Sequence, residues 1–353
     1  MRVAVLGDIC LDAELDAWLG ARVPELHQAL RADVVVANFE SVIDGSRAGE
    51  PAEGKIHLST PLQALGKLKA IGVDYLSVAN NHIMDYGEDA AAETIAKLED
   101  VFGSGRVFGW NGRPGVQLAP GLEVLGVCFP EANPRGTDGP VGPVVTDEID
   151  EILALRASPS TLIYAHWGEE QLTLASPSQR RRAREFVDGG AAHVVGSHSH
   201  VIGPGESLGG RPVGEGGPTV LYGLGNFLFP AMPKGSARVL GSNTRSAAAL
   251  YEWNGSMLRY VGWHHCSFRP GFDVSVRRGR TLFPGSPVAR LHLALGDAAG
   301  ESIYRWTLST RGLRLGMVKV LTGVEAPSVG KLRTALRLIR GGTASTGRSE
   351  RCM

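Results

Sequence analysis

Seven short apolar runs rich in β-branched residues recur along the chain, and they constrain its fold more than any other feature. They span residues 3–6, 34–37, 75–78, 124–129, 162–165, 193–195 and 219–222. Segments with helical spacing of apolar residues separate most of them, at residues 61–71, 88–98 and 178–187. Strands that alternate with helices predict a layered α/β fold up to about residue 230.

The later part of the chain has a different pattern. Residues 247–253, 257–263 and 289–295 resemble strands with no helix between them, so we expect antiparallel strands that close a second sheet. We expect a main domain at residues 1–270, with residues 271–326 adding strands that pack on it or extend it.

The last segment, residues 327–353, predicts a basic amphipathic helix followed by a flexible tail. Its basic residues interleave with leucines and an isoleucine: Lys331, Arg333, Arg337 and Arg340. Such a helix is either a surface element with a solvated face or a weak contact for an anionic surface or a protein partner.

Composition narrows the classes of partner and compartment. Lysine plus arginine and aspartate plus glutamate are equal at 36 each, so charge gives no argument for a nucleic-acid partner. The cysteines form no C-x-x-C pair, which favours the reducing cytoplasm: Cys10, Cys128, Cys266 and Cys352. No run approaches the roughly 18 to 20 apolar residues of a transmembrane helix, and a signal peptide is not expected.

Polar residues follow the apolar runs, at the points where strands are expected to end. They are Asp8, Glu40, Asn80, Asn81, His82, His166, His198 and His200. Ligands of open α/β sheets bind at the carboxyl edge of the strands, so we expect these side chains to converge on one rim.

Carboxylates, an amide oxygen and imidazoles together form a mixed ligand set for a divalent transition metal. This set suits manganese, iron or zinc and is too rich in nitrogen for calcium. Six groups are too many for one closed structural zinc site, but they suffice for two ions about 3.5 to 4 Å apart. Two such ions share a bridging carboxylate, for which we choose Glu40, and a bridging water that becomes hydroxide near neutral pH.

Several motifs along residues 1 to about 260 together resemble those of the CapA family, which is named for poly-γ-glutamate capsule biosynthesis. They are Gly7-Asp8, Asn38-Phe39-Glu40, Ala79-Asn80-Asn81-His82 with Asp85 and Gly87, His166-Trp167-Gly168-x-Glu170, Gly196-Ser197-His198-Ser199-His200 and Tyr222-Gly223-Leu224-Gly225-Asn226-Phe227. CapA proteins belong to the calcineurin-like metallophosphoesterase superfamily. The resemblance implies a four-layer α/β/β/α sandwich of metallophosphoesterase type with a dinuclear metal site.

Carried over residue by residue, the resemblance implies a ligand set of Asp8, Glu40, Asn81, His166, His198 and His200. It also implies that His82 donates a proton to the leaving group, a role that reasoning from the residues also favours. Two alternatives stay open: Asn80 could take the place of Asn81, and His82 could be a structural histidine bonded to Asp85. We place His82, Asp85 and Arg245 in the catalytic group, with Arg245 as an oxyanion binder.

Cys10 stands where many metallophosphoesterases have histidine in Gly-Asp-x-His. A thiolate there could ligate a metal, but we expect a small buried residue.

Other residues are candidates for binding the substrate: Lys55, Trp167, Glu170 and Asn226. Lys55 could reach an acidic substrate, and Trp167 is either a cleft residue or core packing. Asn226 either orients a ligand or caps its turn. The four arginines of one helix are expected on its solvated face: Arg180, Arg181, Arg182 and Arg184.

Three functions compete. The first is hydrolysis of a phosphate ester by a hydroxide that bridges the two ions. The second makes or breaks an amide in a glutamyl or amino-acid conjugate, and the third is a non-catalytic accessory role in a biosynthetic complex. Capsule proteins of this family typically carry an N-terminal membrane segment, whereas this chain begins with its first strand. We therefore expect a cytoplasmic enzyme acting on a small, anionic, soluble molecule.

Overall fold

The computed structural model describes residues 1–46, 51, 56–132, 140–146, 160–209, 217–230, 245–267 and 275–279, together with 293, 301–302, 304–305 and 307. The chain divides into two compact units, Met1–Ala231 with Leu240–Arg305 and Met232–Val239 with Trp306–Met353. Every strand and helix named below belongs to the first unit. The domain boundaries at residues 270 and 326 stay predictions. The helix expected at 327–353 and most of the strand expected at 289–295 lie outside the described residues.

The first sheet has the order β16-β15-β14-β1-β2-β5-β6, and β13 also pairs with β1. Its parallel strands are β1 (Arg2–Ile9), β2 (Val34–Phe39), β5 (Tyr75–Ser77), β6 (Val107–Phe108) and β13 (Asn226–Leu228). Its antiparallel strands are β14 (Arg245–Trp253), β15 (Leu258–Ser267) and β16 (Ser275–Gly279). The prediction that the late strands close a second sheet was wrong. They extend the first sheet, because the edge of β1 opposite β2 accepts a strand that is distant in sequence.

The second sheet has the order β11-β12-β10-β9-β8-β7. Its strands are β7 (Gly115–Ala119), β8 (Leu122–Cys128), β9 (Thr161–His166), β10 (His193–Ser197), β11 (Gly205–Ser207) and β12 (Thr219–Leu221). The inner strands are parallel, and an antiparallel strand lies at each edge. A separate pair joins β3 (Val42–Ile43) to β4 (Ser59–Thr60). Each of the seven apolar runs therefore overlaps a strand of one of the two large sheets.

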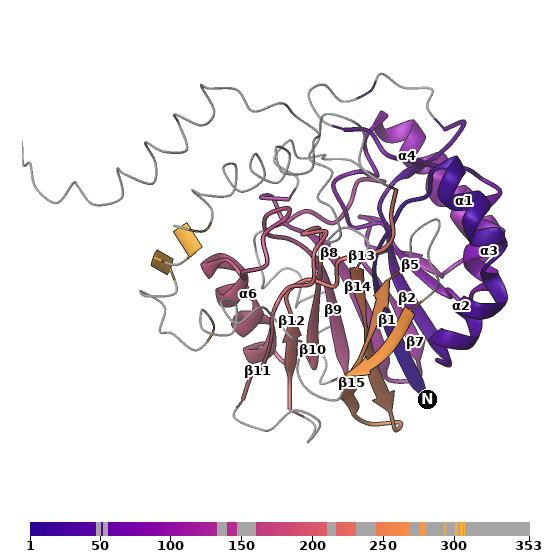
Figure 1. Cartoon of the computed structure of the whole chain (residues 1–353). Coiled ribbons are helices and arrows are strands. Elements are labelled where there is room, and N and C mark those ends of the chain that lie inside the picture. Colours follow the sequence, from indigo (N-terminus) through magenta and orange to yellow (C-terminus); the bar gives the residue numbers. More distant parts are fainter. Residues whose placement is uncertain are drawn as a thin grey trace, which may run out of the picture. The chain divides into compact units, whose positions relative to one another are not determined.

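Helices cover the outer face of each large sheet, as Figure 1 shows with α1 to α4 on one side and α6 on the other. The helices on the first sheet are α1 (Ala13–Gly20), α2 (Val23–Leu30), α3 (Ala64–Ala70) and α4 (Gly87–Phe102). The helix on the second sheet is α6 (Pro177–Asp188). The two sheets pack face to face between these helices, so the predicted four-layer α/β/β/α sandwich is confirmed.

Helix α6 begins where its sequence indicates, at a capping box. The Ser176 hydroxyl accepts from the Gln179 backbone N–H at 3.0 Å, and the Ser176 N–H donates to the Gln179 side chain at 2.8 Å. The prediction of a solvated arginine face was wrong for Arg180 and Arg182, which are buried. The Arg182 guanidinium lies 4.2 Å from the centre of the Phe129 ring and pairs with Glu131, so residues that follow β8 cover it.

Side chains on opposite faces of β1 enter different cores. Val3 and Val5 pack with Tyr164 and Val195 between the two sheets, whereas Leu6 packs with the helices. Because both faces of the central strands are covered, their sequences are continuous apolar runs rather than alternating ones. Among the helices that the structure describes, none is long and apolar enough to cross a membrane.

His193, the first residue of β10, is buried between hydrogen bonds that require a neutral ring. Its Nδ1 accepts from the Thr219 backbone N–H at 3.1 Å, and its Nε2 donates to the Leu258 carbonyl at 2.9 Å. Burial lowers the pKa of this imidazole from 6.5 to about 4. Between these pH values the unfolded chain binds a proton that the folded chain does not, so the free energy of unfolding falls as the pH drops.

We expect His193 to contribute about 3 kcal/mol to the acid destabilisation of the metal-free protein between pH 6.5 and pH 4. Denaturant titrations at both pH values, with EDTA present, measure this free energy. In His193→Gln the amide can still donate to the Leu258 carbonyl but does not titrate, so its pH dependence should be smaller by that amount. An unchanged pH dependence would assign the effect to other groups.

Candidate metal centre

The strand ends bring the predicted polar residues to one place. Asp8 lies near the end of β1, Glu40 directly follows β2, and His166 is the last residue of β9. His198 and His200 follow β10. The loop after β5 carries Asn80, Asn81 and His82.

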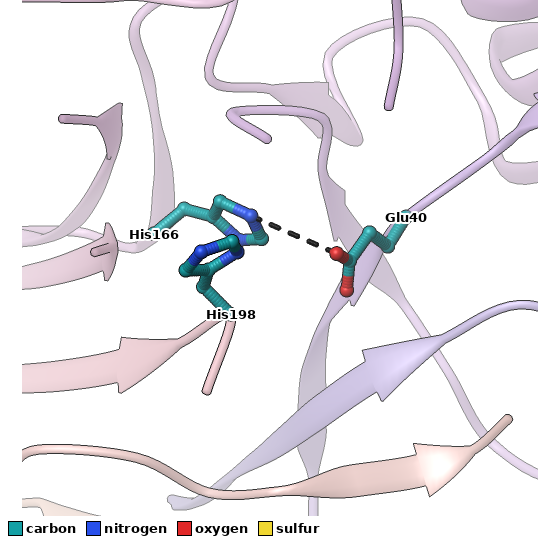
Figure 2. Close-up of side chains that lie close together, drawn as sticks. All are labelled: Glu40, His166 and His198. Carbon is teal, nitrogen blue, oxygen red and sulfur yellow. Dashed lines mark ion pairs between the residues drawn. The ribbon is translucent and has the colours of Figure 1, made fainter. Parts of the chain in front are cut away.

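Among the residues that the structure describes, two groups of side chains could each hold a metal ion, and Glu40 belongs to both. The first is Glu40, His166 and His198, and the second is Asp8, Glu40 and His200. Within each group the ligand atoms lie within 4.8 Å of one another. Figure 2 shows the first group, with the His166 and His198 rings from one sheet facing the Glu40 carboxylate from the other.

The Glu40 carboxylate is fully buried, and neither oxygen has a hydrogen-bond partner among the described residues. Its Oε1 lies 3.7 Å from His166 Nε2 and 3.8 Å from His200 Nε2, too far for hydrogen bonds. Burial, and then the charge of Asp8, raise the pKa of Glu40 well above its ordinary value. Two atoms that each bind one ion at about 2.0–2.2 Å lie up to about 4 Å apart, so these spacings fit a divalent metal. Such an ion would also offset the unfavourable burial of the carboxylate.

The backbone after β10 is strained where it presents the two histidines. His198 has φ 82° and His200 has φ 55°. Both angles lie in the left-handed region of the backbone, which residues other than glycine rarely adopt. Such conformations persist where the surrounding structure enforces them, commonly at functional sites. Gly196 enables the close packing here, because a Cβ at this position would lie 2.3 Å from the Tyr222 carbonyl oxygen.

Buried polar groups behind the ligands hold them in place. Ser197 Oγ lies 3.0 Å from His166 Nδ1, and the Asn38 side chain donates to Asp8 Oδ1 at 2.8 Å. These contacts fix ring and carboxylate orientations, as the outer contacts of metal ligands generally do. Neither Asn38 nor Ser197 was assigned a role from the sequence. The only signal was their place within the Asn38-Phe39-Glu40 and Gly196-to-His200 motifs.

The charge of His200 depends on its carboxylate neighbours. Burial alone would lower the pKa of this imidazole, but Glu40 and Asp8 outweigh burial and raise it to about 10. Its Nδ1 lies 3.5 Å from Asp8 Oδ2. The two carboxylates therefore favour a positive charge in this space, whether from a proton or from a metal ion.

The structure separates the roles of the two adjacent asparagines. Asn80 holds the loop, since its Nδ2 donates to Asn38 Oδ1 and the Phe39 carbonyl and its Oδ1 accepts from two backbone N–H groups. Asn81 Oδ1 instead lies 2.9 Å from His166 Nε2, the atom that faces Glu40. This geometry favours Asn81 over Asn80 as the amide ligand.

His82 combines the two arrangements that were predicted as alternatives. Its Nδ1 lies 2.8 Å from Asp85 Oδ2, which also accepts from the Leu58 backbone N–H at 2.9 Å. Its Nε2 lies 4.0 Å from Glu40 Oε1. The buried Asp85 carboxylate thus orients the ring so that Nε2 faces the candidate metal centre.

Cys10 is buried, and it belongs to neither metal-candidate group among the described residues. Its Sγ lies 3.9 Å from the Ser59 carbonyl oxygen and 4.0 Å from Thr60 Oγ1. Burial raises the pKa of this thiol, so the neutral form is favoured. The geometry favours the packing role over the ligand role.

Trp167 is a core residue, so of its two predicted roles the geometry favours core packing over a place in the cleft. It is fully buried, donates to the Tyr222 carbonyl at 3.1 Å and stacks on the Tyr222 ring at 5.9 Å. Glu170 is half-buried, and its charge acts on both Glu40 and His200. It therefore lies close to the candidate centre.

The outcomes differ for the predicted substrate-binding residues Asn226 and Lys55 and the predicted oxyanion binder Arg245. Asn226 is buried with its Oδ1 2.8 Å from His200 Nδ1, so it lies at the centre itself. Arg245 is exposed at the start of β14, next to the turn that carries Asn226. Lys55 lies outside the described residues.

A four-layer α/β/β/α sandwich with carboxylate and imidazole groups at its strand ends defines a protein of the metallophosphoesterase type. The family described as bacterial capsule synthesis protein PGA_cap matches residues 2–231 of the chain. The chain belongs to this family, the CapA family of the metallophosphoesterase-like superfamily.

Two named relatives are similar in sequence to part of this chain. PGA biosynthesis protein CapA of Bacillus subtilis (strain 168) is 29% identical over 212 residues, covering 56% of this chain and 53% of the relative. Capsule biosynthesis protein CapA of Bacillus anthracis is 29% identical over 215 residues, covering 56% and 51%. The chain thus spans about half the length of the curated relatives it matches.

Two solved structures show weaker similarity. A hypothetical protein from Thermus thermophilus has a TM-score of 0.46 and 20% identity, covering 79% of this chain and 99% of that one. A novel phosphatase from Mycoplasma pneumoniae has a TM-score of 0.41 and 14% identity, covering 82% and 96%.

Proposed function

We propose that the chain is a metal-dependent hydrolase that cleaves a phosphate ester at a dinuclear centre. The observation that carries this proposal is the membership of Glu40 in both metal-candidate groups. A carboxylate shared by two ligand groups can hold two ions as close together as a two-metal site needs. The proposed ligands are those of the sequence prediction: Asp8, Glu40, Asn81, His166, His198 and His200. Manganese, iron or zinc suits this mixture of oxygen and nitrogen donors.

The proposed chemistry divides between the bound ions and the chain's own residues. The ions, when bound, supply Lewis acidity and lower the pKa of a shared water to near neutrality. A water molecule supplies the oxygen that bonds to phosphorus and releases a proton as the bond to the leaving oxygen breaks. His82, protonated on both ring nitrogens, donates its Nε2 proton to that leaving oxygen, while the Asp85 carboxylate accepts from Nδ1. Asn81 and the exposed Arg245 offer groups for the phosphate oxygens.

A second candidate is the hydrolysis or formation of an amide in a glutamyl conjugate. The names of the relatives favour it, since the protein from Bacillus subtilis is called a PGA biosynthesis protein. A purely accessory role is less well supported, because such a protein needs no His82–Asp85 pair beside the ligands. The chain's described cysteines are buried free thiols, which supports the proposed location in the cytoplasm.

The proposal is tested with protein reconstituted separately with Mn(II), Fe(II) and Zn(II). Each form is given a panel of phosphate monoesters and diesters and a panel of γ-glutamyl amides, with EDTA-treated protein as the control. We expect metal-dependent cleavage of phosphate esters only. Cleavage of the amides alone would favour the second candidate, and inactivity of the metal-loaded protein on both panels would favour the accessory role.

A further inference from the structure

Asn226 reaches the candidate metal centre because β13 pairs with β1 at Asp8. The Gly225 carbonyl accepts from the Asp8 backbone N–H at 3.1 Å, and Asp8 pairs with Asn226 in the register. A Cβ on Gly7 would lie 1.8 Å from the Gly225 oxygen, so only glycine at position 7 permits this approach. Gly225 itself has φ 72°. The backbone therefore delivers the Asn226 side chain next to Asp8.

The Asn226 amide meets the outer nitrogen of the His200 ring. Its Oδ1 lies 2.8 Å from His200 Nδ1, closer than Asp8 Oδ2 at 3.5 Å. The other ring nitrogen, Nε2, lies 3.8 Å from Glu40 Oε1 and faces the candidate centre. The two ring nitrogens of His200 thus face different groups. Nδ1 faces Asn226, and Nε2 faces Glu40 in the ligand group.

An amide oxygen accepts hydrogen bonds and cannot donate them. Contact with Asn226 Oδ1 therefore requires the proton of His200 on Nδ1, and in the neutral ring this leaves the lone pair on Nε2. A carboxylate at this position would select the same tautomer. It would, however, add another buried negative charge beside Asp8 and Glu40, which an amide avoids.

The other end of the Asn226 amide shows that the residue is not simply filling space. Asn226 is 2% exposed, and its Nδ2 has no hydrogen-bond partner among the described residues. Buried polar atoms without partners are rare and call for an explanation. Leucine, of similar size, would fill the same volume without this unfavourable burial.

We infer that Asn226 is a positioning residue that selects the tautomer of His200 and thereby sets the metal affinity of the Asp8–Glu40–His200 group. This inference rests on the proposed metal centre. Outer contacts of this kind typically change metal affinity by about 10- to 100-fold. His200 is not a member of the Glu40–His166–His198 group, so the affinity of that group should change little.

The test compares Asn226→Leu, which removes the acceptor, with Asn226→Asp, which keeps it. Stepwise Mn(II) and Zn(II) affinities are measured by competition with a chelator of known affinity. Nitrogen-15 NMR of the Zn(II)-loaded proteins, in which His200 is not doubly protonated, reports which ring nitrogen of His200 carries the proton. We expect Asn226→Leu to weaken one binding step by about 10- to 100-fold and to lose the Nδ1–H tautomer of the wild type. Asn226→Asp should keep the tautomer.

Each outcome bears on a different statement. Unchanged stepwise affinities and an unchanged tautomer in Asn226→Leu would overturn the inference. If Asn226→Leu does not fold, loss of the Nδ1–H tautomer in Asn226→Asp would overturn it instead. If the wild type binds no metal, the proposed function fails and this inference fails with it, whereas metal binding that is the same in wild type and Asn226→Leu overturns the inference alone.

Discussion

Replacing Glu40 with glutamine should lower the metal content from about two ions per chain to near zero and remove metal-dependent turnover. Glu40 is the carboxylate that both candidate groups contain. Gln is neutral and similar in size, so the change removes the shared anionic ligand and little else. His198→Ala removes a ligand from one group only. It should therefore lower the metal content by about one ion rather than two.

Stability measurements separate ligand loss from unfolding in Glu40→Gln. The pKa of Glu40 is raised by burial and by Asp8, so its charged form is unfavourable in the metal-free protein. Glu40→Gln should then be at least as stable as the wild type in EDTA, and less stable than the wild type when excess metal is present. Glu252→Gln, a change at an exposed ion pair with Arg259, is the matched control and should affect neither quantity. Full metal content in Glu40→Gln would contradict the role of Glu40 as the metal ligand that both groups share.

Replacing His82 with alanine should leave the metal content unchanged and lower kcat by about 10²- to 10⁴-fold. The reason is that the Asp85 carboxylate accepts from His82 Nδ1, so the imidazolium form of the ring directs its Nε2 proton toward the centre. The loss should be largest for alkyl phosphates and small for nitrophenyl phosphates, because good leaving groups depart without a proton. His27→Ala, at an exposed histidine of α2, is the matched control.

The leaving-group dependence distinguishes the catalytic role of His82 from a structural one. Equal losses of kcat for good and poor leaving groups would contradict proton donation. If His82→Ala does not fold, Asp85→Asn serves in its place, because it weakens the same contact without deleting the ring. It should then lower kcat more for alkyl phosphates than for nitrophenyl phosphates.

The sequence predicted the sheets well where the signal is local. Runs buried on both faces are continuous and β-branched, so their strands could be recognised one at a time. The pairing of β14 with β1 was missed because it joins residues far apart in the chain, such as Arg2 and Glu252, and no local pattern records it. Helices α1 and α2 were missed because each has only eight residues, too few to show a sustained helical repeat.

In the candidate site, too, residues with a local sequence signal were predictable, whereas contacts between distant segments were not. Residues directly at strand ends, such as Asp8 and His166, were identified because position in a parallel sheet determines which edge they share. The two roles of Trp167 could not be separated from the sequence, because its burial depends on Tyr222 and Phe129, which are distant in sequence. The contact between Asn226 and His200 depends likewise on the approach of β13 to β1, which only the tertiary structure reveals.

Metal analysis of the wild-type protein tests the central claim most directly. The protein is purified without chelators, and manganese, iron and zinc are measured per chain by plasma mass spectrometry, before and after reconstitution. The shared Glu40 carboxylate predicts about two transition-metal ions per chain. A reproducible value of zero, with no uptake on reconstitution of folded protein, would contradict the dinuclear centre and the hydrolytic function that depends on it.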